Sequence, residues 1–293
     1  MVNAPVDQAE GLRRMLSFSR ARTIAITAGS RGAGATSCTV NLASALARLG
    51  SRVLVIDENF DENVACALGV RTRYELKDVI SGACRLEDAL VQGACGLTVL
   101  AAAGAVRALH RLDRESQERA IKCFTRLDEL ADLVLLDARN DANANELSPF
   151  AAAAQEVIVV VSPGSASITG AYAAVKNMSQ AHGRKRFRVL VNRAQDGPMT
   201  RLLEGNMQQA ARKHLDVALE FMGAVPLDPA VIVSARRFSA AVEAAPTAAA
   251  SRQFCEHAAT MLRWSAPQDD VSRLDNFMQR AIYGSRSLAA AGV

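Results

Sequence analysis

Short apolar runs alternate with longer amphipathic segments along most of this 293-residue chain, and this alternation constrains the fold more than any other feature. Several of the runs are apolar almost throughout, which is typical of strands in a parallel sheet that is covered on both faces. The expected strands are Thr23–Thr27, Arg52–Asp57, Leu97–Ala101, Leu133–Asp137, Val157–Val161, Phe187–Asn192 and Leu219–Val225.

Helix-length segments separate these strands. The expected helices are Thr36–Leu49, Arg114–Leu130, Ile168–His182, Pro198–Leu215 and Thr247–Trp264. Regular alternation of strand and helix implies right-handed crossovers, so we predict an α/β fold with a doubly wound, mostly parallel sheet and helices on both faces. Two terminal segments fall outside the alternation. We therefore expect a core domain at 23–264, flanked by segments 1–22 and 265–293.

Composition excludes several classes of protein. The net charge of +4 is too small to indicate a nucleic-acid partner without a basic patch. The six cysteines are scattered without a Cys-x-x-Cys pair, which argues against zinc, iron–sulfur and disulfide frameworks and favours reduced thiols. No segment has the apolar length of a signal peptide or a spanning helix. A cytoplasmic protein is expected.

A glycine-rich turn follows the first expected strand and precedes a helix. Its residues are Gly29, Ser30, Arg31, Gly32, Ala33, Gly34, Ala35, Thr36 and Ser37. Such a turn lets backbone N–H groups approach a phosphate, and the helix dipole adds to their attraction. Against the template G-x-x-x-x-G-K-[ST], however, Ala35 stands where the lysine belongs. The residues alone leave two interpretations: a nucleotide loop, or a turn that binds nothing.

Two carboxylates lie where a nucleotide-binding sheet would need them. Asp57 and Asp137 each follow four apolar residues, as a Walker B aspartate does. Both are expected at the carboxyl edge of the sheet, where doubly wound folds bind ligands. With the Thr36 hydroxyl they could hold Mg²⁺, directly or through water. The alternative is that each aspartate is a polar residue that ends a strand.

The order of these motifs resembles the deviant-Walker P-loop ATPases related to MinD and ParA. The segments 189–193 and 223–228 resemble the places where that family contacts adenine, which implies nucleotide contacts at Asn192 and Pro226. The nearest resemblance, from Asp7 to Ile282, is to the FlhG family of flagellar regulators, also called FleN or YlxH. It implies ATP and Mg²⁺ as cofactors, a homodimer, and control of flagellar number and placement. A flagellar transcription activator and switch components are the implied partners.

The chain departs from that family at the nucleotide loop. Ser30 and Ala35 replace both family lysines, and Asn59 stands where the family has a catalytic-region carboxylate. A charge-assisted hydrogen bond contributes roughly 1.5–3 kcal/mol, so each lost lysine weakens binding about ten- to a hundredfold. Phosphoryl transfer depends on positioned positive charge. We expect hydrolysis to be weak or absent, and we assign no catalytic residue. Two versions of the function stay open: an ATP-driven switch and a nucleotide-insensitive adaptor. Arg31, directly after Ser30, is a candidate cation to replace a missing lysine.

The first residues form a second motif. Asp7 and Glu10 have the spacing of a capping box, and Ala9, Leu12, Met15 and Leu16 form one apolar stripe. A helix of this length is not stable alone, so it packs on its own domain or folds on a partner. The segment resembles the one by which FlhG-type proteins stimulate FlhF, a GTPase of the signal-recognition type. The resemblance implies partner contacts at Asp7, Gln8, Ala9, Leu12 and Arg13, with Gln8 near the partner's nucleotide.

Near the C-terminus, apolar residues recur at helical spacing, with arginines around them. Leu274, Phe277, Met278 and Ile282 form this stripe. A terminal amphipathic helix of this kind can lie in a membrane interface, and the family uses one in this way. The resemblance therefore implies peripheral contact with the inner membrane at the cell pole. The alternative is a helix that docks on the core.

A basic run at 184–188 follows a helix pattern. Cations are favourable at a helix C-terminus, which favours a solvated helix end. Non-specific DNA contact, as in partition ATPases, is the other interpretation. The alternative function is therefore a partition or positioning ATPase that acts on DNA or another cargo, although we expect no nucleic-acid partner.

Overall fold

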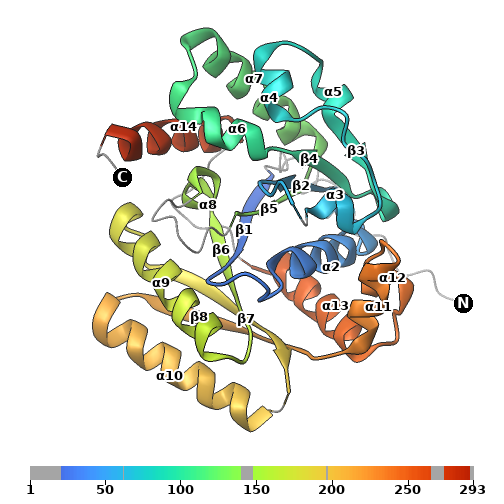
Figure 1. The fold of residues 1–293 in the computed structure, drawn as a ribbon, viewed down its shortest axis with the longest axis vertical. Helices are drawn as coiled ribbons and strands as arrows, with labels where there is room; N and C mark the ends of the chain where they lie inside the picture. The colour runs from blue at the N-terminus through green and yellow to red at the C-terminus, as the bar shows by residue number, and fades with distance from the viewer. Residues whose placement is uncertain (1–20, 62, 140–147, 196, 265–273, 291–293) are drawn as a thin grey trace, which may run out of the picture.

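The structure is a computed structural model that describes residues 21–61, 63–139, 148–195, 197–264 and 274–290. One sheet runs through its centre (Figure 1). Its strands are β1 (Arg22–Ala28), β2 (Val53–Asp57), β3 (Leu90–Gln92), β4 (Thr98–Ala101), β5 (Leu133–Asp137), β6 (Glu156–Val161), β7 (Arg186–Ala194) and β8 (Ala218–Pro226). Their order is β3-β4-β2-β5-β1-β6-β7-β8. All neighbours pair in parallel except β3 and β4, which are antiparallel. The predicted fold class is confirmed.

Helices cover both faces of this sheet. The long ones are α2 (Ala35–Arg48), α7 (Arg114–Leu130), α9 (Ser165–His182), α10 (Gly197–Leu215), α13 (Ala249–Leu262) and α14 (Leu274–Ala290). The short ones are α3 (Val64–Ala67), α4 (Leu76–Ser81), α5 (Leu86–Ala89), α6 (Ala103–Ala108), α8 (Pro149–Ala153), α11 (Pro229–Arg236) and α12 (Ala241–Ala244), with 3₁₀ turns η1 (Ala94–Gly96) and η2 (Leu109–Arg111). Each predicted strand and helix is present with shifts of a few residues at its ends. Strand β3 and the short helices were not predicted.

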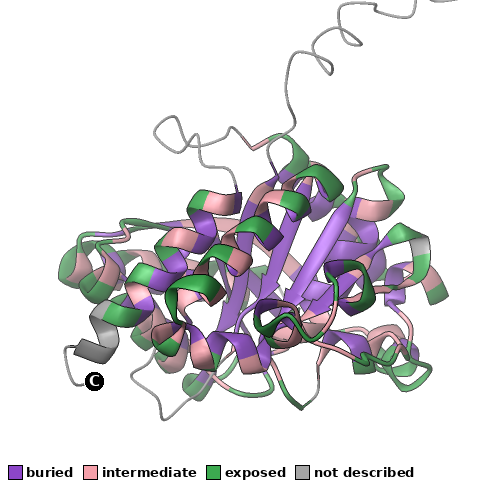
Figure 2. Cartoon of the chain, turned by 90° about the horizontal axis from the view of Figure 1, so that it is seen from above, coloured by how far each residue is buried: buried purple, intermediate pink, exposed green. Residues whose placement is uncertain are grey.

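Successive residues of a strand pack into two different hydrophobic cores, one on each face of the sheet. On β1, Ile24 and Ile26 face the core under α2 and α13, whereas Ala25 faces the core under α7, α8 and α14. This separation follows from the two-residue period of a strand. Buried strands therefore lie between half-exposed helices (Figure 2). A sheet buried on both faces requires the near-continuous apolar runs seen in the sequence.

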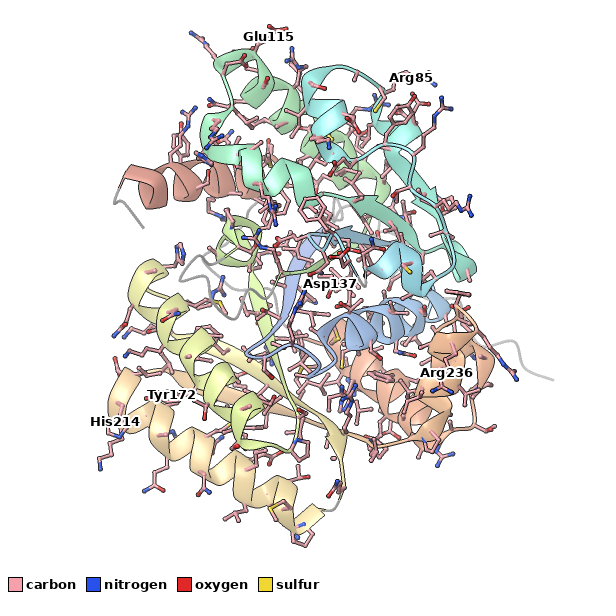
Figure 3. All side chains as sticks on the ribbon, viewed as in Figure 1. Arg85, Glu115, Asp137, Tyr172, His214 and Arg236 are labelled. Carbon is pink, nitrogen blue, oxygen red and sulfur yellow. The ribbon has the colours of Figure 1, made fainter. Side chains whose placement is uncertain are left out.

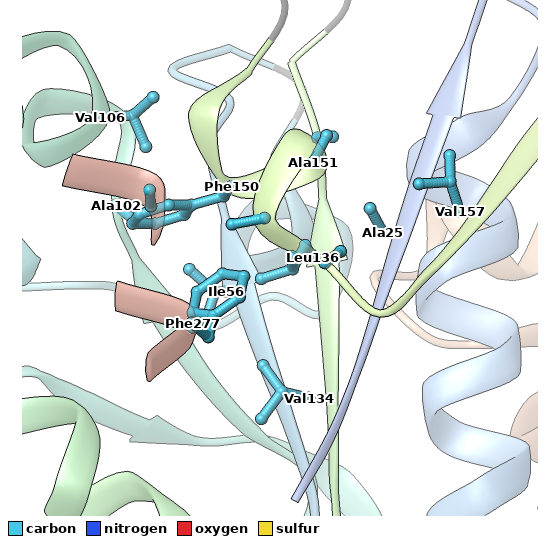
Figure 4. Packing of buried hydrophobic residues seen from close by; sticks show 14 of the residues in the cluster. Ala25, Ile56, Ala102, Val106, Val134, Leu136, Phe150, Ala151, Val157 and Phe277 are labelled. Atoms are coloured by element: carbon cyan, nitrogen blue, oxygen red, sulfur yellow. The ribbon is translucent and has the colours of Figure 1, made fainter. Parts of the chain in front are cut away.

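The C-terminal helix α14 belongs to the second of these cores. Leu274, Phe277, Met278 and Ile282 are each at most 2% exposed. Phe277 packs between Phe124 of α7 and Phe150 of α8, with ring centroids 5.7 and 5.5 Å away (Figure 4). The expectation that these four side chains face a membrane is therefore wrong for this structure. The docked alternative is correct, because the stripe gains more by covering α7 and α8 than it would exposed to water.

The residues proposed to bind a GTPase partner, Asp7, Gln8, Ala9, Leu12 and Arg13, lie outside the described part of the chain. Among the helices that are described, none is long and apolar enough to cross a membrane.

Candidate nucleotide site

The glycine-rich turn lies between β1 and α2, at the carboxyl edge of the sheet. Gly32 and Gly34 adopt positive φ angles of 80° and 96°, a conformation that side chains rarely tolerate. Gly34 is the N-cap of α2, and its carbonyl accepts the first helical hydrogen bond from the Cys38 N–H at 2.9 Å. The first turn of α2 contains no acidic residue. Its free N–H groups are thus available to an anion.

Contacts with two other elements, β7 and α9, hold this turn in place. The Asn192 side-chain amide, at the end of β7, donates to the Ala33 carbonyl at 2.9 Å. A Cβ on Gly34 would lie only 2.3 Å from that amide nitrogen. On the other side, Gly29 meets Gly170 of α9 so closely that a Cβ on Gly29 would lie 1.8 Å from backbone atoms. A side chain at Gly29 or Gly34 would therefore clash with neighbouring atoms, and Gly34 also needs glycine for its positive φ angle.

The two predicted aspartates are neighbours in the sheet. Asp57 and Asp137 are register partners on β2 and β5 and are at most 2% exposed. Thr36 Oγ1 donates to Asp137 Oδ2 at 2.7 Å, and Thr39 Oγ1 donates to Asp137 Oδ1 at 2.8 Å. The loop threonine and both carboxylates thus meet around Asp137, as predicted; Asp137 is labelled in Figure 3.

Asn59 lies between the two carboxylates. Its side-chain amide donates to Asp137 Oδ2 at 2.8 Å and to Asp57 Oδ1 at 3.2 Å. Asp57 also accepts the backbone N–H groups of Asn59 at 2.9 Å and of Val64 at 2.5 Å. Asn59 therefore acts as a hydrogen-bond donor to both acids.

Burial and mutual repulsion disfavour ionisation of these acids. Burial first, and then the neighbouring Asp57 charge, raise the pKa of Asp137 to about 7. Burial likewise raises the pKa of Asp57 above its usual range. A divalent cation would relieve this repulsion. The donor set, two carboxylates and the Thr36 hydroxyl, consists of the oxygen ligands that Mg²⁺ prefers, and phosphate oxygens and water complete such sites. The types of donor therefore fit Mg²⁺; in this structure all four carboxylate oxygens accept hydrogen bonds from Thr36, Thr39, Asn59 or Val64, and a bound ion would replace some of these donors.

Glu58 is a buried acid that the sequence interpretation missed. It is 1% exposed, accepts the Arg139 N–H at 3.1 Å, and accepts the Ser148 hydroxyl at 2.5 Å. Burial raises its pKa to about 7. Ser148 is the N-cap of α8, so Glu58 joins the site to the helix that packs on Phe277. Its position after an apolar strand, beside Asp57, was the one sequence signal that could have indicated it.

A cavity of about 500 Å³ opens beside the loop, a size suited to a small-molecule ligand. The predicted site residues that line it are Ser30, Arg31, Gly32, Gly34, Ala35, Thr36, Ser37 and Asn59. The other predicted residues Gly29, Ala33, Asp57, Asp137 and Asn192 do not line the cavity. Pro226 pairs with Ala194 across β7 and β8 and does not line the cavity.

Four arginines line the same cavity: Arg31, Arg107, Arg139 and Arg193. Arg107 lies over the ring of Phe60, 4.5 Å from its centroid. Only Arg31 was considered as a substitute cation from the sequence, because the other three come from distant elements. Their gathering depends on the order of the strands, which no local pattern reveals.

The basic residues at 184–188 form ion pairs and hydrogen bonds with other residues of the protein. Lys185 pairs with Asp216 and Arg186 with Glu220. Arg188 pairs with Glu156 and Glu220 and lies over the ring of Trp264. Arg184 donates to backbone carbonyls at 154 and 155. These cations neutralise an edge of the sheet and give the DNA interpretation no support.

The parallel sheet, the glycine loop at a helix N-terminus and the paired aspartates define a P-loop nucleotide-binding protein. Residues 21–189 match the family described as an AAA domain. The chain is 34% identical to the antiactivator FleN of Pseudomonas aeruginosa over 272 residues, covering 92% of this chain and 97% of that protein. It therefore belongs to the FlhG/FleN family of MinD/ParA-like P-loop ATPases.

Solved structures agree with this fold. The MinD cell division protein of Aquifex aeolicus aligns with a TM-score of 0.64 at 24% identity, over 85% of this chain and all of that one. The Mg-ADP complex of the septum site-determining protein MinD from Pyrococcus horikoshii aligns with a TM-score of 0.60 at 23% identity, over 83% and 96% of the two chains.

Proposed function

We propose that this protein is an antiactivator of the FleN type that regulates flagellar number and placement and acts in the cytoplasm at the cell pole. The observation that carries the proposal is the likeness to FleN over 92% of this chain, well beyond the loop and the two aspartates. Its partners would be an FlhF-type GTPase, a flagellar transcription activator and switch components.

The N-terminal segment would carry the action on the GTPase. The residues Asp7, Gln8, Ala9, Leu12 and Arg13 retain the family pattern, in contrast to the nucleotide loop, which has lost both lysines. A short amphipathic segment that gains its helix on binding would present Gln8 to the partner's nucleotide. In this proposal, the segment acts as an activating motif while the core positions it.

The test is GTP hydrolysis by the purified FlhF-type GTPase of the same organism. The full chain is expected to stimulate it, whereas deletion of Met1–Leu16 and the Gln8→Ala variant are expected to lose most of the stimulation. Gln209→Ala, on the exposed side of α10, is a matched control that should act like the wild type. Equal stimulation by the deletion variant would contradict the proposal.

The core would bind ATP and Mg²⁺ but hydrolyse ATP slowly. The cavity, the free N–H groups of α2 and the oxygen ligands Thr36, Asp57 and Asp137 support binding. Slow hydrolysis follows from Ser30, Ala35 and Asn59, because the loop brings no lysine and the carboxylate position holds an amide. ATP binding would then favour a homodimer.

The Ser30→Lys/Ala35→Lys double variant tests the cause of slow hydrolysis. Turnover should rise at least tenfold if the missing lysines limit it, since each would restore a charge-assisted contact in the transition state. Turnover that stays at the wild-type level would show that the lysines are not the cause, and Asn59→Asp would be the next variant.

A further inference from the structure

The cavity beside the loop is cationic although the loop has no lysine. Four arginines line it, and among the described lining residues Asp61 is the only acidic one. The arginines come from the loop, from α6, from the segment after β5 and from the end of β7. The site therefore has positive charge, supplied by Arg31 of the loop and by three arginines from other elements.

Arg193 differs from the other three arginines in its backbone conformation. Its φ of 56° is left-handed, a conformation that a long side chain adopts only under constraint. The described chain has three non-glycine residues with positive φ, and two of them, Arg193 and Phe238, line this cavity. Strained backbone at a cavity is a common mark of a functional position.

The cause of this conformation is a bulge. Asn192 pairs with Val225, and Ala194 pairs with Pro226, so Arg193 is the extra residue of β7 between them. A bulge turns the side chain of its extra residue out of the regular alternation of the strand. Asn192, directly before it, is fixed by its hydrogen bond to the loop carbonyl of Ala33. The bulge therefore turns the Arg193 side chain towards the cavity, and the hydrogen bond of Asn192 fixes the residue before it.

Arg193 lines the same cavity as Gly34 and Ala35, the N-cap and first residue of α2. Arg193 is exposed, and no ion pair is found for it among the described residues. A cation without a carboxylate partner, near a helix N-terminus, is suited to a phosphate.

We propose that Arg193 takes the place of the missing loop lysine and binds the phosphate groups of the nucleotide in this cavity. The inference rests on the proposed nucleotide site and adds the residue that supplies its charge. A guanidinium can contact two phosphate oxygens at once.

The test is calorimetric titration of the full chain with Mg·ATP and, separately, with inorganic triphosphate. Arg193→Ala should weaken both affinities at least tenfold and reduce their dependence on salt, because one ionic contact is lost. Arg193→Lys should retain most of the affinity. Arg201→Ala, an exposed arginine on α10 outside the cavity, should bind like the wild type.

Arg193→Gly separates binding from folding. Glycine accepts the left-handed conformation without strain, so this variant should melt at the wild-type temperature or above while binding as weakly as Arg193→Ala. Wild-type affinity in either variant would overturn the inference, as would a wild-type chain that binds neither ligand.

These outcomes are distinct from failure of the proposed regulatory function. A chain that stimulates the GTPase but binds no anion would overturn the inference about Arg193 alone. A chain with Arg193-dependent binding that does not stimulate the GTPase would support the inference and contradict the regulatory function.

Discussion

The side-chain amide of Asn59 donates a hydrogen bond to Asp137 Oδ2 at 2.8 Å and another to Asp57 Oδ1 at 3.2 Å. The amide thus supplies a donor between two buried acids where another acid would repel them. This arrangement stabilises the two acids without a cation, and an amide at this position cannot act as a base towards water.

The first prediction concerns Asn59→Asp. This change should lower the free energy of unfolding by roughly 1–3 kcal/mol without ligand, because a donor is lost and a third acid is added beside Asp57 and Asp137. Mg²⁺ with ATP should restore most of the loss. Thermal unfolding with and without Mg·ATP measures both effects, and an unchanged melting temperature would contradict the description of the site.

A second prediction follows from the raised pKa values of Glu58 and Asp137, both about 7. Their folded pKa values exceed those of the unfolded chain, so the folded state binds more protons between about pH 4 and pH 7. Stability should therefore fall as pH rises through this window, by roughly 3–4 kcal/mol per carboxyl, and level off above it.

The Glu58→Gln variant isolates this effect. Burial lowers the pKa values of His182 and His257 below 6.5, so these groups act in the opposite direction just below about pH 6.5. Denaturant unfolding at several pH values should show a smaller fall with pH in the variant than in the wild type. Parallel pH profiles would contradict the assignment.

The third prediction concerns loop packing. Gly34→Ala should destabilise the protein by about 1–3 kcal/mol and abolish nucleotide binding, because its Cβ would lie 2.3 Å from the Asn192 amide at a φ of +96°. Gly205→Ala on α10 is the matched control. Outside its own helix backbone and chain neighbours, nothing lies within 4 Å of its added Cβ, so it should stabilise by ~0.5–1 kcal/mol. Similar effects of the two changes would show that the loop is not packed as described.

A fourth prediction concerns α14. Phe277→Ala should destabilise by about 3–5 kcal/mol, since it removes the ring between Phe124 and Phe150. Tyr283→Ala, at a position 68% exposed on the same helix, should change stability by less than about 0.5 kcal/mol. Equal effects of the two substitutions in urea unfolding would mean that the helix is not docked in solution.

The sequence pattern predicted those parts of the fold that depend on residues close together in the chain. The apolar runs ending at Asp57 and Asp137 placed both acids at one sheet edge, and the register of β2 and β5 confirmed it. Two kinds of feature needed the structure. Arg107, Arg139 and Arg193 meet only through strand order, and the stripe of Phe277 has the same periodicity whether it faces lipid or a protein core.

The central claim is that this site binds ATP without either family lysine while hydrolysing it slowly. A single-turnover experiment with Mg·ATP labelled on the γ-phosphate, combined with equilibrium binding of the same preparation, tests it most directly. We expect binding in the micromolar range and conversion at least tenfold slower than in the Ser30→Lys/Ala35→Lys variant. No detectable binding at millimolar ATP, or wild-type conversion as fast as the variant's, would contradict it.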